Sequence, residues 1–131
     1  MTENLLHYSI TEKIIQSFFT VNKNLPYGLP ADAYGNALVI EFEQNNLKVE
    51  KDYSIELKYR KIKIGVLRTD FLIDKKVLVK VVSVDSITKR ILDDSKLMLK
   101  CSDHEVCMVL NSLGDNDYKR IIFTNDYKKN K

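Results

Sequence analysis

The stretch RTDFLIDKKVLVKVVSV, residues 68–84, decides the fold of this chain. Two apolar runs flank the charged triplet at 74–76, and each run has the length of a strand. The second run, 77–84, is apolar at odd and even positions alike, which is typical of a central strand covered on both faces. Lys80 is the one charged residue in that run. It is therefore the anomaly of an otherwise apolar core strand.

A chain of short strands extends outward from this segment. Residues 53–59 alternate apolar and polar side chains, as a half-buried strand does. Arg60 and Lys61 are predicted to turn the chain into a second strand at 62–73, which residues 74–76 join to the third. Two further strands are predicted at 105–110 and 118–124, on either side of the turn NSLGDND.

Two helices are predicted before the strands. Ser9 and Glu12 have the spacing of a capping box, so the first helix is expected to begin at Ile10. The loop LPYGLP, residues 25–30, ends this helix, and Pro30 suits the first turn of the second. Apolar residues recur at helical spacing in both segments, which indicates that each helix packs one face on a core.

A third helix is predicted between the third and fourth strands, with Asp85 and Ser86 as its cap. The resulting order is ααβββαββ. We therefore predict one α+β domain over residues 1–131, an α/β sandwich with a central mixed sheet flanked by helices. Residues 1–9 and the polar residues 125–131 are expected to be frayed tails.

Composition sets broad limits on function. The chain has 131 residues, 44% hydrophobic and 30% charged, with a net charge of +3 and a pI of about 8.8. This mildly basic balance permits nucleic-acid contact without requiring it, because nucleic-acid-binding domains concentrate more charge. The sequence contains no run of 18 or more apolar residues, the length needed to span a membrane. The N-terminus lacks the pattern of a secretory signal.

Cysteine usage favours a reducing compartment. The only two cysteines, Cys101 and Cys107, cannot form a disulfide framework, so a cytoplasmic location is expected. Together with His104 they are spaced C-x-x-H-x-x-C, which briefly resembles a zinc cluster. Only three ligands are present, and Cys107 lies in an apolar run where a free cysteine packs as a small hydrophobe. No metal and no cofactor are therefore expected.

Several short motifs lie in order along the chain. The first helix reads TEKIIQSFFTVNKNL, and residues 28–34 read GLPADAY. The second strand carries Arg68-Thr69-Asp70, the third reads VLVKVV at 77–82, and K-R-I follows at 119–121. In this order the motifs resemble the bacterial GxxExxY family within the PD-(D/E)XK nuclease superfamily. Gly28 and Tyr34 of its naming motif are kept and Ala31 replaces the glutamate, while the third strand departs from the family pattern V-x-V-E-x-K.

The resemblance implies a nuclease-like fold with a degenerate site. In the superfamily the aspartate and the strand glutamate ligate a divalent cation, and a lysine two residues later helps to activate water. Here Asp70 remains, but Lys80 replaces the strand glutamate and Val82 replaces the lysine. With Ala31 also lacking a carboxylate, the site is expected to be inactive. Lys80 is expected to pair with Asp70 where the metal would lie.

Two carboxylates could rescue such a site. Asp32 neighbours the lost helix position, although one residue along a helix turns a side chain by about 100°. Glu56, on the first strand, could face the cavity if the sheet curls. A metal-dependent nuclease with migrated ligands therefore stays open as an alternative.

Two non-catalytic functions also fit the sequence. The first is a nuclease-like domain without activity that serves as a protein-binding or structural subunit of a larger assembly or homo-oligomer. The second is a nucleic-acid-binding module that retains the ancestral groove. Its candidate contacts are the basic residues around the first strand turn, Lys58, Arg60, Lys61 and Lys63.

Overall fold

A computed structural model describes residues 6–128 of the chain. The elements, in chain order, are α2 (Tyr8–Asn24), α3 (Ala31–Gln44), β1 (Val49–Tyr59), β2 (Ile62–Ile73), β3 (Val77–Val82), α4 (Lys89–Lys100), β4 (Val106–Asn111), β5 (Tyr118–Ile122) and the short 3-10 helix η1 (Asn125–Tyr127). The order ααβββαββ predicted from the sequence is confirmed.

The strands form one five-stranded mixed sheet in the order β1-β2-β3-β4-β5. β3 and β4 are parallel, and every other neighbouring pair is antiparallel. A parallel pair requires a crossover connection, and α4 supplies it. The sheet is therefore mixed and flanked by helices, as the α+β prediction stated.

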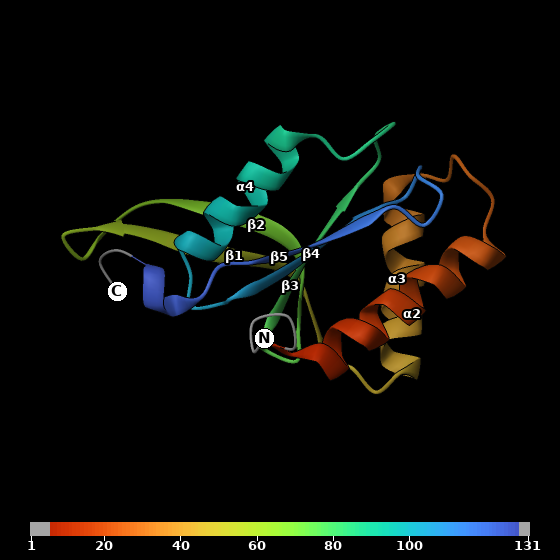
Figure 1. The fold of residues 1–131 in the computed structure, drawn as a ribbon, viewed down its shortest axis with the longest axis horizontal. Coiled ribbons are helices and arrows are strands. Elements are labelled where there is room, and N and C mark those ends of the chain that lie inside the picture. The colour runs from red at the N-terminus through yellow and green to blue at the C-terminus, as the bar shows by residue number, and fades with distance from the viewer. Residues whose placement is uncertain (1–5, 129–131) are drawn as a thin grey trace.

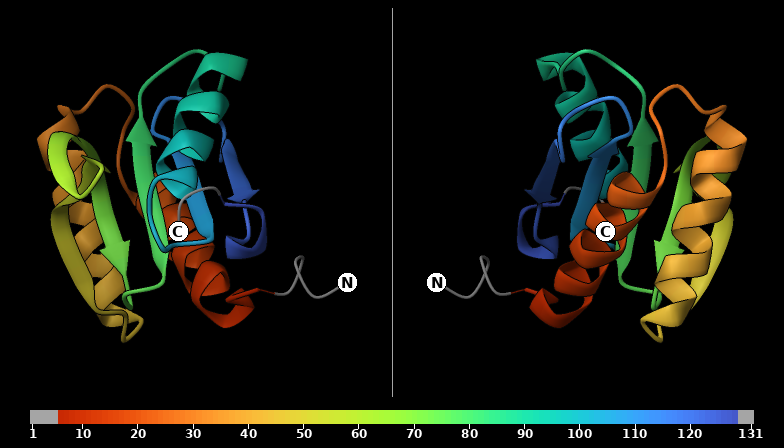
Figure 2. Two further views of the ribbon diagram at one scale, coloured as in Figure 1. Left: turned by 90° about the vertical axis from the view of Figure 1, so that its left-hand side faces the viewer. Right: turned by 90° about the vertical axis from the view of Figure 1, so that its right-hand side faces the viewer.

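The helices cover opposite faces of the sheet (Figure 1). α2 and α3 lie side by side on one face (Figure 2, right) and pack Phe18, Leu38 and Phe42 against it. α4 covers the other face and buries Leu99 there. None of the helices in residues 6–128 is long and apolar enough to cross a membrane.

β3 is the central strand, as its two-faced apolar pattern predicted. Val77 and Val79 are fully buried under α2 and α3, and Leu78 is fully buried on the α4 side. Alternate side chains of a strand point to opposite faces, so a strand covered twice must be apolar throughout. Lys80 interrupts this pattern on the strand and is only partly buried.

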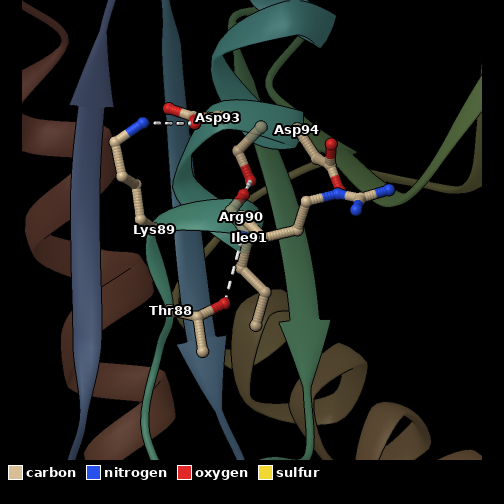
Figure 3. Close-up of polar contacts among 7 residues, drawn as sticks. Thr88, Lys89, Arg90, Ile91, Asp93 and Asp94 are labelled. Atoms are coloured by element: carbon tan, nitrogen blue, oxygen red, sulfur yellow. Dashed lines mark hydrogen bonds and ion pairs between the residues drawn. The ribbon is translucent and has the colours of Figure 1, made fainter.

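Both predicted helix caps differ from the structure. α2 begins at Tyr8, after His7 in the left-handed conformation with φ 54°, and no side chain caps it. The capping box at Ser9 was therefore the wrong start. α4 begins at Lys89, where the Thr88 hydroxyl accepts a hydrogen bond from the Ile91 N–H at 3.3 Å (Figure 3). An extended connection after β3 delays this helix beyond the expected cap.

The structure also differs from the predicted frayed tails. Tyr8 and Ser9 are part of α2, and residues 125–127 form η1. The Asn125 N–H donates to the Glu105 carboxylate at 2.8 Å, which ties η1 to the start of β4. The remaining tail residues, 1–5 and 129–131, lie outside the described part of the chain.

The hairpin of β1 and β2 extends beyond the rest of the sheet (Figure 1). β2 pairs with β3 over only Phe71–Ile73, although it runs from Ile62. The turn consists of Arg60 and Lys61, at φ 52° and 67°. Two consecutive residues at positive φ match the twist of a two-residue hairpin. We call residues 53–70 the ribbon.

Candidate functional site

The candidate site lies where β2 and β3 separate. The last paired residues are Phe71 and Val79, and beyond them side chains replace the backbone ladder. The Thr69 hydroxyl donates to the Val79 carbonyl at 2.8 Å. The Asp70 Oδ2 atom accepts a hydrogen bond from the Val81 N–H at 2.7 Å. These two contacts hold the diverging strands together without a continuous ladder.

Beside this point the odd-numbered side chains of β1 switch from one face of the sheet to the other. Val49 packs with the α2–α3 cluster, whereas Tyr53 and Ile55 pack with the α4 cluster, although all three positions are odd. Asp52 lies between them with φ 54°. Aspartate tolerates this left-handed conformation better than most residues. The backbone irregularity at Asp52 therefore accompanies the exchange of faces and places this side chain at the candidate site.

A pocket of about 340 Å³ opens at the separation. We call it the divergence pocket. Its lining residues are Asp52, Arg68, Thr69, Asp70, Lys80 and Val81. The formal charges are two carboxylates, one guanidinium and one ammonium, which sum to zero. The sequence identified Asp70, Lys80 and Arg68. It missed Asp52, which lies just before the alternating stretch at 53–59 and belongs to none of the motifs.

The expected direct ion pair between Lys80 and Asp70 is wrong. The two residues line one pocket, but no ion pair of 4.0 Å or less joins them among the ion pairs of residues 6–128. The Asp70 carboxylate is instead directed to the backbone of β3, at Val81. Lys80 thus contributes a positive charge to the pocket without forming an ion pair with Asp70.

Several positions singled out by the motif lie elsewhere. Ala31 is exposed at the start of α3, and Val82 packs against the α4 cluster; neither lines the divergence pocket. The two candidate rescue carboxylates, Asp32 and Glu56, do not line it either. The carboxylate that the structure adds to the site is Asp52.

Gly28 and Tyr34 have structural roles. Gly28 has φ 87°, a conformation that glycine adopts without strain. Tyr34 is buried, and its hydroxyl donates to the Asn22 Oδ1 atom at 2.5 Å. Burial raises the pKa of this phenol far above its ordinary value, although the Asn22 hydrogen bond opposes the shift. The contact joins α3 to the end of α2.

The acidic residues on α4 are committed to its own surface. Lys89 contacts Asp93 at 2.9 Å, and Arg90 contacts Asp94 at 3.4 Å (Figure 3). The hydrogen bond from Lys89 lowers the pKa of Asp93. Neither aspartate lines the divergence pocket.

The candidate nucleic-acid contacts gather at the tip of the ribbon. Lys58 and Lys63 both approach Glu56, at 3.4 and 3.9 Å. The Arg60 guanidinium lies 5.6 Å from the centre of the Tyr59 ring, and Lys61 is exposed beside it in the turn. The structure therefore brings the four predicted residues together, with Glu56 offsetting part of their charge.

A second hollow, of about 710 Å³, lies along β1 and the segment after α4. We call it the edge groove. His104 lines it, with its Nε2 atom 3.1 Å from the Tyr53 hydroxyl oxygen, and burial lowers the pKa of this histidine. Cys101 is exposed in the groove, whereas Cys107 is buried in the core. The described residues contain no group of three or more metal-binding side chains.

Comparison with known proteins places the chain at the level of a superfamily. Searches of curated proteins and of solved structures gave no match. A profile described as the PD-(D/E)XK nuclease superfamily matches residues 8–121, which include every helix and strand from α2 to β4 and most of β5. The chain therefore belongs to the PD-(D/E)XK nuclease superfamily.

Proposed function

We propose that this chain is a nuclease-like domain without hydrolytic activity that works as a protein-binding or structural subunit, in a larger assembly or as a homo-oligomer. The observation that carries the proposal is the bond from the Val81 N–H to the Asp70 carboxylate. It gives the one aspartate kept from the superfamily pattern a structural role between β2 and β3.

The donor set of the divergence pocket does not fit a divalent cation. Magnesium requires oxygen ligands in near-octahedral geometry, usually one or two carboxylates together with waters and substrate phosphates. Here Asp52 and Asp70 share the pocket with Arg68 and Lys80. The two positive charges would offset the attraction of the two carboxylates for an entering cation, which would also compete with the Val81 N–H for one Asp70 oxygen.

The ribbon supports a binding role. Three apolar side chains near its tip are largely exposed, Tyr59 at 63%, Ile62 at 69% and Ile64 at 66%. Single exposed apolar residues are ordinary, but several on one projecting hairpin mark a contact surface. A protein partner would remove this surface from water.

Two measurements test the proposal. Purified protein is incubated with supercoiled and single-stranded DNA in magnesium or manganese, and we expect no cleavage above a protein-free control. The tagged protein is then purified from its native host, where we expect stoichiometric protein partners or self-association. Metal-dependent cleavage that is lost in Asp70→Asn would overturn the proposal.

Asp52 is the observation that favours the migrated-ligand alternative, because it brings a second carboxylate into the pocket. The same cleavage assay examines it. If cleavage is observed, Asp52→Asn should abolish it, whereas Asp32→Asn and Glu56→Gln should not, since neither residue lines the pocket. Unchanged cleavage by Asp52→Asn would remove this version of the site.

Nucleic-acid binding without cleavage is a second candidate, favoured by the basic tip of the ribbon. A two-stranded β-ribbon fits the major groove of DNA, and phosphate contacts make affinity fall steeply with salt. A gel shift at two salt concentrations compares two double variants. One carries Arg60→Ala and Lys61→Ala in the ribbon, and the control carries Lys13→Ala and Lys23→Ala on α2. Selective loss in the ribbon variant supports this candidate. Equal losses would indicate general charge attraction.

A further inference from the structure

β1 is an open edge of the sheet. It is the terminal strand in the order β1-β2-β3-β4-β5 and runs for 11 residues. Within residues 6–128, no strand pairs with its outer side. Edge strands of soluble proteins are usually short or covered, because unpaired backbone groups bind another strand readily. A long open edge therefore needs an explanation.

The space beside this edge is open. The edge groove runs along β1 and is lined there by Tyr53, Ile55 and Leu57, with Ile64 from β2. Ile55 and Leu57 lie on the face that α4 covers only in part, since the groove separates β1 from the end of that helix. The hollow therefore leaves β1 side chains on this face for an added strand to pack against.

We propose that the occupant is a second copy of this chain, whose β1 pairs antiparallel with β1 about a two-fold axis at Ile55. The inference rests on the proposed function and names its partner. Antiparallel pairing about residue 55 places Tyr53 of one copy opposite Leu57 of the other, and Ser54 opposite Glu56. An isologous interface of this kind closes after two copies.

The charge pattern of β1 favours this register over one centred on Ser54. About Ile55, Asp52 lies opposite Lys58, and Glu50 comes opposite Arg60 in the turn that ends β1, each twice by symmetry. Opposite charges on facing strand positions stabilise a pair of strands, and like charges destabilise it. A two-fold axis shifted by one residue to Ser54 would place Asp52 opposite Glu56, two carboxylates. The charges that protect an edge from random pairing therefore match in the proposed dimer.

The dimer also affects the divergence pocket. Asp52 belongs to both β1 and the pocket lining. Pairing about Ile55 brings the second copy's Lys58 opposite Asp52, so a third positive charge approaches the pocket. This arrangement makes cation binding still less favourable, and the two sheets become continuous through the paired edges.

Sedimentation of the full chain tests the interface. We expect the wild type to dimerise, and Glu50→Lys or Arg60→Glu alone to weaken the dimer about ten-fold, since both symmetric contacts become repulsive. The double variant should regain wild-type affinity because the pairs are restored with reversed signs. Lys23→Glu on α2 is the matched control and should change nothing. A monomer at all concentrations, or a double variant no better than the singles, overturns the proposal.

Disulfide trapping tests the register in a background where Cys101, which is exposed, is replaced by serine. A mixture of Ser54→Cys and Glu56→Cys chains should cross-link far faster than either alone, because residue 54 faces residue 56 across the axis. Faster cross-linking of Ser54→Cys with itself would place the axis elsewhere and contradict the inference. A monomeric chain that neither cleaves DNA nor loses its host partners would overturn the dimer and leave the proposed function intact.

Discussion

The carboxylate of Asp70 and the backbone N–H of Val81 join β2 to β3 across 2.7 Å, where the regular pairing of the strands has already ended. In the superfamily pattern this aspartate is a ligand. In this chain it accepts a hydrogen bond in the place of a backbone carbonyl of the paired strands. The distinction matters because removal of a catalytic ligand often leaves stability unchanged or improved, whereas removal of a structural acceptor does not.

We therefore expect Asp70→Ala to lower the free energy of unfolding by about 1–3 kcal/mol, the cost of leaving a partly buried donor without its acceptor. Asp70→Asn should lose less, because its amide oxygen can still accept from Val81. Urea unfolding at pH 7 measures both values. An Asp70→Ala variant as stable as the wild type would show that the contact contributes nothing.

Lys80→Glu should create cation affinity in the divergence pocket. The substitution replaces an ammonium by a third carboxylate beside Asp52 and Asp70, with Arg68 as the remaining positive charge. A dissociation constant of about 1 mM would stabilise the variant by about 1.4 kcal/mol in 10 mM manganese. Thermal unfolding with and without the metal measures this shift.

Lys80→Gln is the control for that substitution, because it removes the positive charge without adding a ligand. It should show no manganese-dependent shift, and neither should the wild type. A wild-type shift as large as that of Lys80→Glu would mean that Lys80 does not exclude cations, which would reopen the metal-dependent alternative.

The fold was predictable because it follows from periodicity. The two-faced apolar pattern at 77–84 correctly predicted the central strand, which ends two residues earlier, at Val82, and alternation at 53–59 correctly predicted the C-terminal part of β1. The boundaries of β2 matched, because charged turns enclose the strand on both sides. Helix starts were less accurate. A capping residue shows where a helix can begin, but α4 begins only after an extended connection whose length depends on tertiary packing.

The site was predictable only in part. A motif on contiguous strands correctly brought Arg68, Asp70 and Lys80 together. It could not reveal Asp52, because the left-handed backbone that exchanges the faces of β1 has no sequence signature. It also implied an ion pair, since charge alone does not show that a backbone N–H reaches Asp70 first. The inactive site and the GxxExxY subfamily stay predictions.

The two cysteines should differ sharply in reactivity. Cys101 is exposed, whereas burial raises the pKa of the Cys107 thiol to about 12. At pH 8 a disulfide reagent should modify one thiol in the native protein and two in urea, and none in native Cys101→Ser. Rapid modification of Cys107 in the native protein would show that the core beneath α4 opens readily.

The same burial predicts a loss of stability at high pH. An unfolded cysteine titrates near 8.5, whereas the native thiol keeps its proton to about pH 12. Between these values the native state binds more protons, so the free energy of unfolding falls as pH rises. Cys107→Ala should lack this component when urea unfolding is compared at pH 8 and pH 10. An equal fall in the free energy of unfolding between pH 8 and pH 10 in both proteins would show that Cys107 does not cause it.

His104 should make the protein less stable in mild acid. Burial is the main reason that its pKa is lowered, and its Nε2 atom lies 3.1 Å from the Tyr53 hydroxyl oxygen. The unfolded state, with a histidine pKa near 6.5, then binds more protons than the native state, so stability falls as pH drops below about 6.5.

His7 also has a lowered pKa, mainly through burial, so the informative quantity is the difference between the wild type and His104→Gln. Urea midpoints from pH 7 to pH 5 should fall less steeply in His104→Gln, while Tyr53→Phe, which retains the imidazole, should keep most of the wild-type slope. A His104→Gln slope equal to the wild type would assign the acid sensitivity to other groups, with His7→Gln as the next variant to compare.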